Sequence, residues 1–171
     1  AGAAGAAVGS FVSLRAAVST FMSSMEKLDS LAKTSDKLGI ATEQLAGLRY
    51  AASLTGVSVA TFDMAMQRMT RRVAEAAVGT GEAKGALAEL GLSATRLASM
   101  SPDQAFREIA DAMQNVTRQN DRVRLAMKLF DSEGVALVTT LAAGSRGLDA
   151  MQAEAAKLGI TFSRDVADGA G

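Results

Sequence analysis

The fold of this chain is decided by residues 38–78, which read LGIATEQLAGLRYAASLTGVSVATFDMAMQRMTRRVAEAAV. This stretch contains two helices with their start and stop signals. Gly39 and Gly56 each follow a helix, and glycine takes the left-handed backbone after a C-cap at little cost. Thr42 is predicted to cap the first helix through its hydroxyl, and Ser58 is predicted to cap the second. The stretch therefore predicts two consecutive helices joined by a tight glycine turn.

Apolar residues recur in both helices at steps of three and four. This spacing places them on one face of each helix, and in the second helix it forms the a and d seam of a helix-packing surface. We therefore expect both helices to bury these faces against neighbouring helices. The expected inward residues are Leu45, Leu48, Ala52 and Leu54 in the first helix, and Val59, Phe62, Met66, Met69, Val73 and Ala76 in the second.

The composition of the whole chain favours closely packed helices. Of its 171 residues, 49% are hydrophobic but only 4% are aromatic, and small residues supply much of the apolar fraction. No stretch alternates apolar and polar residues for long enough to predict a strand. We expect an all-α fold, with one long N-terminal helix followed by a compact array of short helices joined by tight glycine turns. The expected division is a heptad helix at residues 1–38 and a helical domain at residues 39–171.

Further start and stop signals divide the rest of the chain. Thr80 is predicted to cap a short helix, and Asn120 or Asp121 a later one that ends near Phe130. Ser132 is predicted to start the next helix. Ser101 followed by Pro102 is the clearest start signal, because proline is tolerated at the first helical position. A stop formed by Leu, Gly and an apolar residue recurs at residues 38–40, 90–92 and 158–160.

The N-terminal 25 residues carry a single charge, Arg15. From residue 11 onward, apolar residues occupy the a and d positions of successive heptads, which is typical of a helix that packs on a partner helix. We expect an amphipathic helix packed in a bundle or against copies of itself. A membrane-spanning helix and a removable leader are the alternatives. The residues of this oligomer seam are Phe11, Leu14, Val18, Phe21, Met25 and Leu28.

Charge and residue usage narrow the functional classes. The chain has 18 basic and 18 acidic residues, so no global field favours nucleic acid or an anionic membrane. It has no Cys and no His, which removes thiolate and imidazole metal sites and the Ser-His-Asp triad. Glu108 and Asp111 could share one helix face as an acid–base pair, but Arg107 and Arg118 are expected to neutralise them. We expect no catalytic residue, no cofactor and no metal, and therefore not an enzyme.

The residues from Ala52 to Phe62 also have the spacing of a helix-turn-helix, which would make the chain a DNA-binding module. In it the second helix reads the major groove with its N-terminal side chains, here residues 58–61 (Ser-Val-Ala-Thr). Val59 and Ala60 can touch only a thymine methyl group, and Asp63, which follows, would face phosphates. Arg68, Arg71 and Arg72 could contact phosphate, but they lie one to two turns later. We therefore interpret the motif as a tight corner in a packed domain, with no specific nucleic acid as a partner. The residues of this helix corner are Ala52, Gly56, Val57 and Phe62.

The stretch at residues 38–69, LGIATEQLAGLRYAASLTGVSVATFDMAMQRM, resembles the helical segment of tape measure proteins of tailed bacteriophages. The likeness continues in LAMKLF at residues 125–130 and in the residues from 132 to 137. It returns at residues 147–160. The order and spacing of these parts together carry the resemblance, which covers most of the chain.

This resemblance implies a structural virion protein of the viral tail. A tape measure protein occupies the lumen of the tail tube and sets the length of the tube during tail assembly. At genome ejection it leaves ahead of the DNA, and in many phages it helps to form a channel through the host envelope. The implied partners are further copies of the same chain, commonly a homotrimer, the tail tube and tail tip or baseplate proteins, and the host membrane.

The chain departs from that family in its compactness. A ruler is an extended helix or coiled coil, whereas residues 39–171 are divided by glycines into short helices. The chain does not begin with Met, so we expect a fragment of a longer protein. This part is expected to be a folded region at an end of the ruler, near the tail tip, or a region that refolds on ejection. A membrane-active helical protein unrelated to phages is the third functional class.

Overall fold

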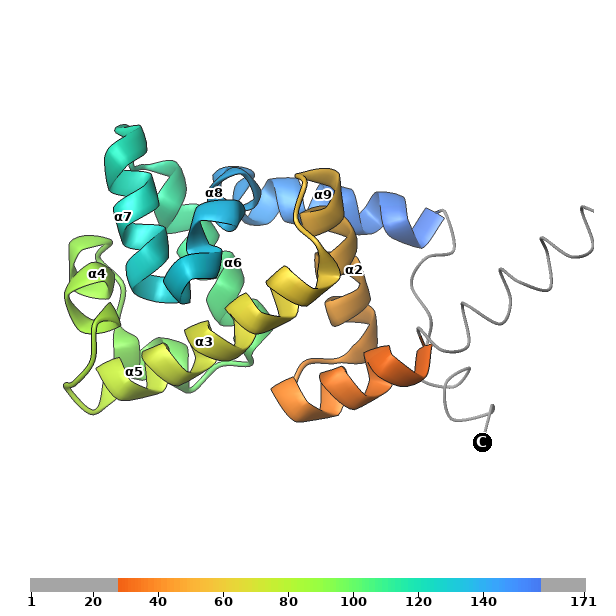
Figure 1. Cartoon of the computed structure of the whole chain (residues 1–171), viewed down its shortest axis with the longest axis horizontal. Coiled ribbons are helices and arrows are strands. Elements are labelled where there is room, and N and C mark those ends of the chain that lie inside the picture. Colours follow the sequence, from red (N-terminus) through yellow and green to blue (C-terminus); the bar gives the residue numbers. More distant parts are fainter. Residues whose placement is uncertain (1–27, 158–171) are drawn as a thin grey trace, which may run out of the picture.

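The computed structural model describes residues 28–157, and this part of the chain consists of helices and their connections without any strand (Figure 1). The expected all-α fold class is confirmed. The predicted long N-terminal helix falls mostly on residues 1–27, which lie outside the described part. A helical segment at residues 28–38 comes first. It is followed by α2 (Thr42–Leu54), α3 (Val59–Ala77), α4 (Ala83–Glu89), α5 (Ala94–Ala98), α6 (Pro102–Gln114), α7 (Gln119–Phe130), the 3-10 turn η1 (Asp131–Glu133), α8 (Gly134–Ala142) and α9 (Gly144–Lys157).

Helix α3 is the longest of these elements, and several others are assembled on it. It runs along one side of the molecule, packs against α4, α5 and α7, and meets α2 at its N-terminal end (Figure 1). Helix α9 packs against α2 and α6, while α8 packs against α6 and α7. The ring of Phe106 in α6 makes edge-to-face contacts with Phe62 and Phe130, with ring centroids 5.7 and 5.8 Å apart. The core therefore joins α3, α6 and α7 through three buried aromatic rings.

The helical segment at residues 28–38 packs into the same apolar core. Leu31 and Leu38 are only 6% and 8% exposed, and they cluster with Ile40 and the buried residues of α2. The turn that follows is closed by the Ile40 N–H, which donates to the carbonyl of Ser35 at 3.1 Å. The core thus extends to residues that precede position 38.

Two of the predicted helix caps are wrong because their hydroxyls have other partners. Helix α2 begins at Thr42 itself, whose buried hydroxyl lies 3.3 Å from that of Ser35. The Thr80 hydroxyl donates back to the carbonyl of Glu75, at the C-terminal end of α3, at 3.2 Å. Glu82 occupies the N-cap position of α4 instead. Both threonine hydroxyls therefore stabilise the connection to the preceding helix.

The predicted start of α6 is confirmed, whereas the predicted N-caps of α7 are wrong. Ser101 is the N-cap of α6 and Pro102 its first residue, as predicted, although no side chain completes the cap. The predicted caps of α7, Asn120 and Asp121, lie inside that helix, because it begins one or two residues earlier, with Arg118 at the N-cap position. The Asp121 carboxylate pairs with a basic side chain of α7. A short polar residue in a first turn is thus not sufficient to identify a cap.

Three of the predicted glycine stops are confirmed. Gly39, Gly56 and Gly91 have φ angles of 69°, 84° and 73°, in the left-handed region that other residues rarely adopt. The fourth stop, at Gly159, lies outside the described residues. The predicted cap of α3 is also confirmed, because the Ser58 hydroxyl accepts the backbone N–H of the third helical residue.

The inward faces of α2 and α3 agree with the apolar spacing except beside the turn that joins them. Leu45 and Leu48 are fully buried, whereas Leu54 and Val59 are 52% and 46% exposed. Leu54 lies two positions after buried Ala52, which is roughly 200° round the helix axis, so it points away from the core. The prediction that Leu54 and Val59 face inward is therefore wrong.

Candidate functional site

The helix corner joins the end of α2 to the start of α3 and is closed by backbone hydrogen bonds. The Val57 N–H donates to the carbonyl of Ala52 at 2.9 Å, and the Gly56 N–H donates to that of Ser53 at 3.1 Å. Ala52, Val57 and Phe62 are buried, whereas Gly56 is exposed at the tip of the turn. The structure thus places three of the corner residues in the core and the fourth in the turn itself.

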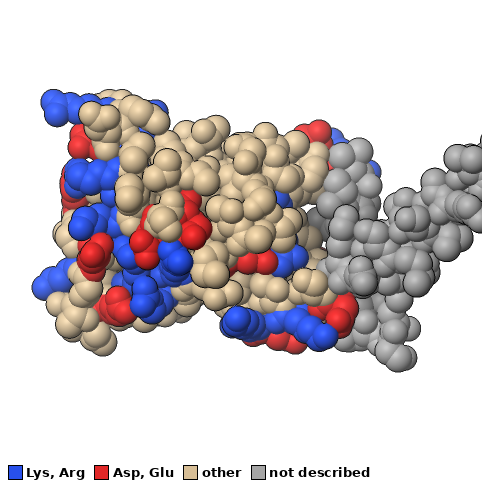
Figure 2. Space-filling model, viewed as in Figure 1, with Lys and Arg blue, Asp and Glu red and all other residues tan. Residues whose placement is uncertain are grey.

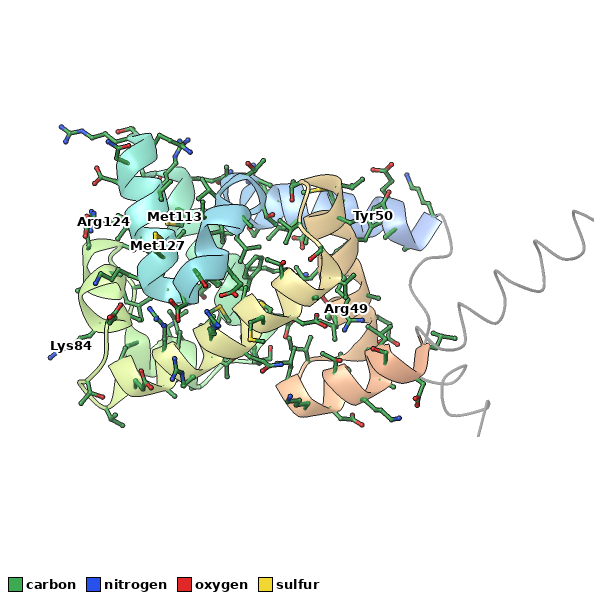
Figure 3. All side chains as sticks on the ribbon, viewed as in Figure 1. Arg49, Tyr50, Lys84, Met113, Arg124 and Met127 are labelled. Carbon is green, nitrogen blue, oxygen red and sulfur yellow. The ribbon has the colours of Figure 1, made fainter. Side chains whose placement is uncertain are left out.

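An ion pair braces this corner from one side. The Arg49 guanidinium donates from Nε and Nη2 to the two carboxylate oxygens of Asp63, at 3.0 and 2.7 Å. The two side chains are only 11% and 17% exposed, and Arg49 lies between α2 and α3 in Figure 3. A bidentate pair of this kind fixes both the distance and the orientation of the two helices. Asp63 therefore belongs to the brace and does not lie on a free outer surface of α3.

Two of the three α3 arginines that were considered as phosphate contacts face inward. Arg72 is 8% exposed, and its Nη1 donates to the carbonyls of Met127 and Lys128 at 3.2 and 2.6 Å. Arg68 also turns toward the 3-10 turn and is partly buried. Only Arg71 projects outward, with 63% of its side chain exposed. The arrangement leaves one outward arginine on α3 where a phosphate-binding face needs several.

Arg68 and Arg72 form an arginine cluster with three acidic residues. Asp131 Oδ2 lies 3.3 Å from Arg68 Nη1 and 3.2 Å from Arg72 Nη2. Arg68 also donates to Glu133 at 2.6 Å, and Arg72 lies 3.5 Å from Glu82. Figure 2 shows acidic and basic side chains interleaved over this end of the molecule, where α3, α4 and α7 meet. The cluster ties α3 to α4 and to the connection between α7 and α8.

Asp131 holds an unusual backbone conformation at the centre of the cluster. Its φ and ψ are 62° and −149°, and it is the one residue other than glycine with positive φ between residues 28 and 157. This region is occupied almost only by glycine, and another residue there costs about 1–3 kcal/mol. The carboxylate offsets that cost, because Oδ1 accepts the Ser132 N–H at 3.0 Å while Oδ2 pairs with the two arginines.

An open groove of about 500 Å³ runs along α7 and includes Glu82, the N-cap residue of α4, and Asp131 of the cluster. Met127 is 44% exposed within it (Figure 3). Glu82 pairs with Lys128 across it at 3.6 Å. The charged lining residues are two acids and two bases, so the groove does not select an ion by charge. Its lining residues are Glu82, Asn120, Val123, Arg124, Met127, Lys128 and Asp131.

A second ion pair links α4 and α7 near this groove. The guanidinium of Arg124, labelled in Figure 3, donates to both carboxylate oxygens of Glu89, at 3.0 and 2.6 Å. These hydrogen bonds lower the pKa of Glu89, because they favour its charged form. The pKa of Arg124 is raised, chiefly by its hydrogen bonds to Glu89 and to a smaller extent by its hydrogen bond to Asp121. The pair is exposed, so it positions α4 on α7 without forming part of a desolvated reactive site.

The acidic pair weighed for catalysis is not assembled as a reactive pair. Glu108 pairs with Arg96, while Asp111 accepts the backbone N–H of Ser145 at 2.7 Å. The expected neutralisation by Arg107 is wrong, because Arg107 turns toward α9 and donates to a carboxylate there. Within the described part of the chain, no group of three or more acidic, His or Cys side chains is placed to hold a metal ion.

The oligomer seam falls almost wholly outside the described residues. Leu28 is the one member within them, and it is half-buried. From residue 28 to residue 157, no helix is both long and apolar enough to cross a membrane. The remaining seam residues, outside the described part, are Phe11, Leu14, Val18, Phe21 and Met25.

No known protein family, curated protein or solved structure matches the chain. Its geometry is one of helix-to-helix braces, at the helix corner and in the arginine cluster, around a packed aromatic core. Such an arrangement holds helices in position.

Proposed function

We propose that this chain is part of a bacteriophage tail tape measure protein. The observation that carries the proposal is the resemblance of residues 38–69 to the helical segment of that family, with its continuation at residues 125–160. The all-α fold is compatible with it. The first part of the resemblance spans α2, the glycine turn and the N-terminal half of α3, and the second spans the end of α7 through α9.

In this role the protein is a structural component of the virion. The parent chain lies in the tail tube lumen or at the tail tip, and its length determines the length of the tube. Its partners are further copies of itself, packed through the seam from Phe11 to Leu28, and the tail tube and tip proteins. At ejection it enters the host envelope and contacts the host membrane.

The compact part described here is best placed at an end of the ruler, or in a region that refolds when the tail empties. A residue adds about 1.5 Å to the length of a ruler only where it lies in an extended helix. Residues 28–157 are folded back repeatedly by tight turns. This part therefore adds little length while it stays folded.

The proposal is tested by shortening the parent protein in its own phage. Deleting six heptads, roughly 42 residues, from the heptad-rich helix outside this domain is expected to shorten the tail by about 63 Å, at 1.5 Å per helical residue. Electron microscopy of purified particles measures the tail length. As a control, the same segment is replaced by an unrelated heptad sequence of equal length, which is expected to preserve the tail. Tails of unchanged length after the deletion would refute the proposal.

We do not propose a DNA-binding function for the helix corner. Val59 and Ala60 offer no hydrogen-bonding group to a base edge, and Arg68 and Arg72 are held within the arginine cluster. A fluorescence titration of the full chain against a random duplex pool at moderate salt is expected to enrich no site. An enriched sequence whose binding is lost on Thr61→Ala substitution would instead favour a helix-turn-helix reader.

A further inference from the structure

Helices α7 and α8 follow each other in the sequence without a loop between them. From Gln119 to Ala142 every residue belongs to α7, η1 or α8, and the direction of the chain changes at Asp131. Most other helix breaks in the described part use a glycine of positive φ, but the sequence Phe-Asp-Ser-Glu at residues 130–133 contains neither glycine nor proline. The positive φ at this break falls on Asp131 instead, whose carboxylate is held by arginines of α3.

We infer that Arg72 and Asp131 form a latch that keeps residues 119–142 as two helices. When α3 withdraws from α7, these residues join into a single helix. The inference concerns the fold alone and does not depend on whether the chain is a tail protein.

The first argument is an exchange of hydrogen bonds at the break. In a continuous helix the carbonyl of Lys128 accepts the N–H of Ser132, four residues later. Here each of those two groups has a side-chain partner instead. The Lys128 carbonyl accepts from Arg72 Nη1 at 2.6 Å, and the Ser132 N–H donates to Asp131 Oδ1 at 3.0 Å. Arg72 and Asp131 therefore replace one of the backbone hydrogen bonds that a continuous helix would make at this point.

The second argument is that the two latch residues also hold each other. Asp131 Oδ2 lies 3.2 Å from Arg72 Nη2, so one ion pair connects the two substituted hydrogen bonds. Arg68, one helical turn before Arg72, holds the other side of the break through Ser132 and Glu133, at 3.1 and 2.6 Å. All the basic groups of the latch come from α3. This side-chain support for the broken form is therefore lost when α3 leaves α7.

The third argument is that residue 131 itself prefers the unbroken form. An aspartate at φ 62° and ψ −149° is in a region that favours glycine, whereas the helical backbone is open to it. Gly134 has an ordinary helical φ of −58°, so it fits either form. In the broken form it lets the backbones approach closely, because a Cβ there would lie 2.2 Å from the Ala126 carbonyl oxygen. The local chain is therefore built to permit the fold-back but not to favour it.

The core keeps the latch closed in the folded protein. Phe130, Leu137 and Leu141 are fully buried against neighbouring helices, and straightening at Asp131 would remove some of them from that core. The single helix is consequently expected only after the packing of α3 has been weakened. A pull on α3, or a partner that binds it, would open the latch.

The test measures the distance between the two ends of this region in the full chain. Gln119 and Ala142 are exposed, so both can be replaced by Cys and spin-labelled. The chain has no Cys of its own, so no other position is labelled. One helix over this span would separate the labelled backbones by roughly 35 Å. The folded form should give a shorter distance, since α7 and α8 pack against each other. Distances are measured by pulsed spin resonance through a urea titration, with circular dichroism recording helix content.

Two pairs of variants isolate the latch. Asp131→Ala and Asp131→Gly both remove the carboxylate, but alanine favours helix and disfavours positive φ, whereas glycine does the opposite. The ratio of long to short distances is expected to be roughly 30-fold higher for alanine. Arg72→Gln should populate the long distance at lower urea than the wild type. Arg71→Gln, on the same helix but outside the latch, should behave as the wild type.

Three outcomes would overturn the inference. The long distance could be absent from Arg72→Gln and Asp131→Ala at every urea concentration. The alanine and glycine variants could give the same ratio, which would mean that the backbone preference of residue 131 does not set the equilibrium. Finally, Arg72→Gln could lose helix content without gaining the long distance, which would show that α7 and α8 unfold rather than join.

Discussion

Replacement of Phe106 by alanine tests whether the aromatic core holds α3, α6 and α7 together. Phe106 is completely buried, and its ring contacts both Phe62 and Phe130 edge to face. Removing a buried phenylalanine side chain costs about 3–5 kcal/mol through lost apolar burial and the cavity left behind. Domains of this size are commonly stable by about 5–15 kcal/mol. Phe106→Ala is therefore expected to remove a large share of the stability.

Phe106→Leu separates ring geometry from apolar volume. Leucine keeps much of the volume but loses both edge-to-face contacts, each worth about 0.5–1.5 kcal/mol. The expected loss is therefore about 1–3 kcal/mol, clearly smaller than for alanine. Leu54→Ala, at a site that is 52% exposed, is the control and should cost less than about 0.5 kcal/mol.

Urea unfolding of the full chain, followed by circular dichroism, measures all three variants. With a slope of about 2 kcal/mol/M, a loss of 4 kcal/mol would lower the urea midpoint by about 2 M. If Phe106→Ala lost less than about 1 kcal/mol, the three rings would not be the centre of the core. If leucine and alanine cost the same, the edge-to-face geometry would have no part in the explanation.

Three further predictions concern the seam, the glycine turns and the exposed ion pair. Replacing Phe21 and Leu28 by Asp is expected to convert an oligomer into monomers in light scattering, because charge on the a and d positions prevents helix packing. Gly56→Ala and Gly91→Ala should each lower the thermal midpoint by costing about 1 kcal/mol at positive φ, and should raise liposome flotation because alanine favours continuous helix. Glu89 has a lowered pKa when folded, so its contribution to stability is present above its ordinary pKa of 4.5 and is lost as the pH falls through the folded value. The melting difference between wild type and Glu89→Gln should therefore be largest near neutral pH and vanish in acid.

Each of these has a result that contradicts it. A wild type that is monomeric at high concentration would exclude the seam as an oligomer contact in this chain. Glycine variants that melt lower yet float no more than wild type would leave the glycines as ordinary caps. A melting difference that persists unchanged into acid would mean that the Glu89 substitution acts through packing and not through charge.

The glycine turns of this fold could be predicted from the sequence, because their cause is local. Gly39, Gly56 and Gly91 are followed by an apolar residue, and each takes positive φ where the helix ends. The space around their missing Cβ atoms is open, so their role rests on backbone conformation alone. Such a signal needs no knowledge of distant parts of the chain.

Side-chain caps could be predicted less well, because a hydroxyl near a helix start has several possible partners. Ser58 caps α3, but Thr42 turns inward to Ser35 and Thr80 bonds back to the end of α3. The choice depends on which element packs against the helix start. That information is in the tertiary arrangement and not in the local sequence.

The sequence predicts a new helix from Ser132, which is close to the observed break after Phe130, but it does not predict the positive φ of Asp131 that turns the chain there. The partners of Asp131, Arg68 and Arg72, lie about 60 residues earlier, and residues 130–133 contain neither glycine nor proline to signal that conformation. The two arginines were recognisable only as basic residues on one side of α3, where they suggested a phosphate contact. The conformation of Asp131 and the inward orientation of the two arginines thus depend on long-range ion pairs, which the local sequence does not reveal.

The described part of the chain is entered and left at the same end of the molecule. Helices α2 and α9 pack against each other, and Gln152 donates to the Gln44 carbonyl at 3.3 Å. The red beginning of the first described helical segment and the blue end of α9 both lie on the right in Figure 1. The folded part therefore adds little to the end-to-end distance of the chain. Drawn out as one helix, the same residues would span roughly 195 Å. A longer filament that contains this part could therefore lengthen without additional residues, if the short helices straightened into one.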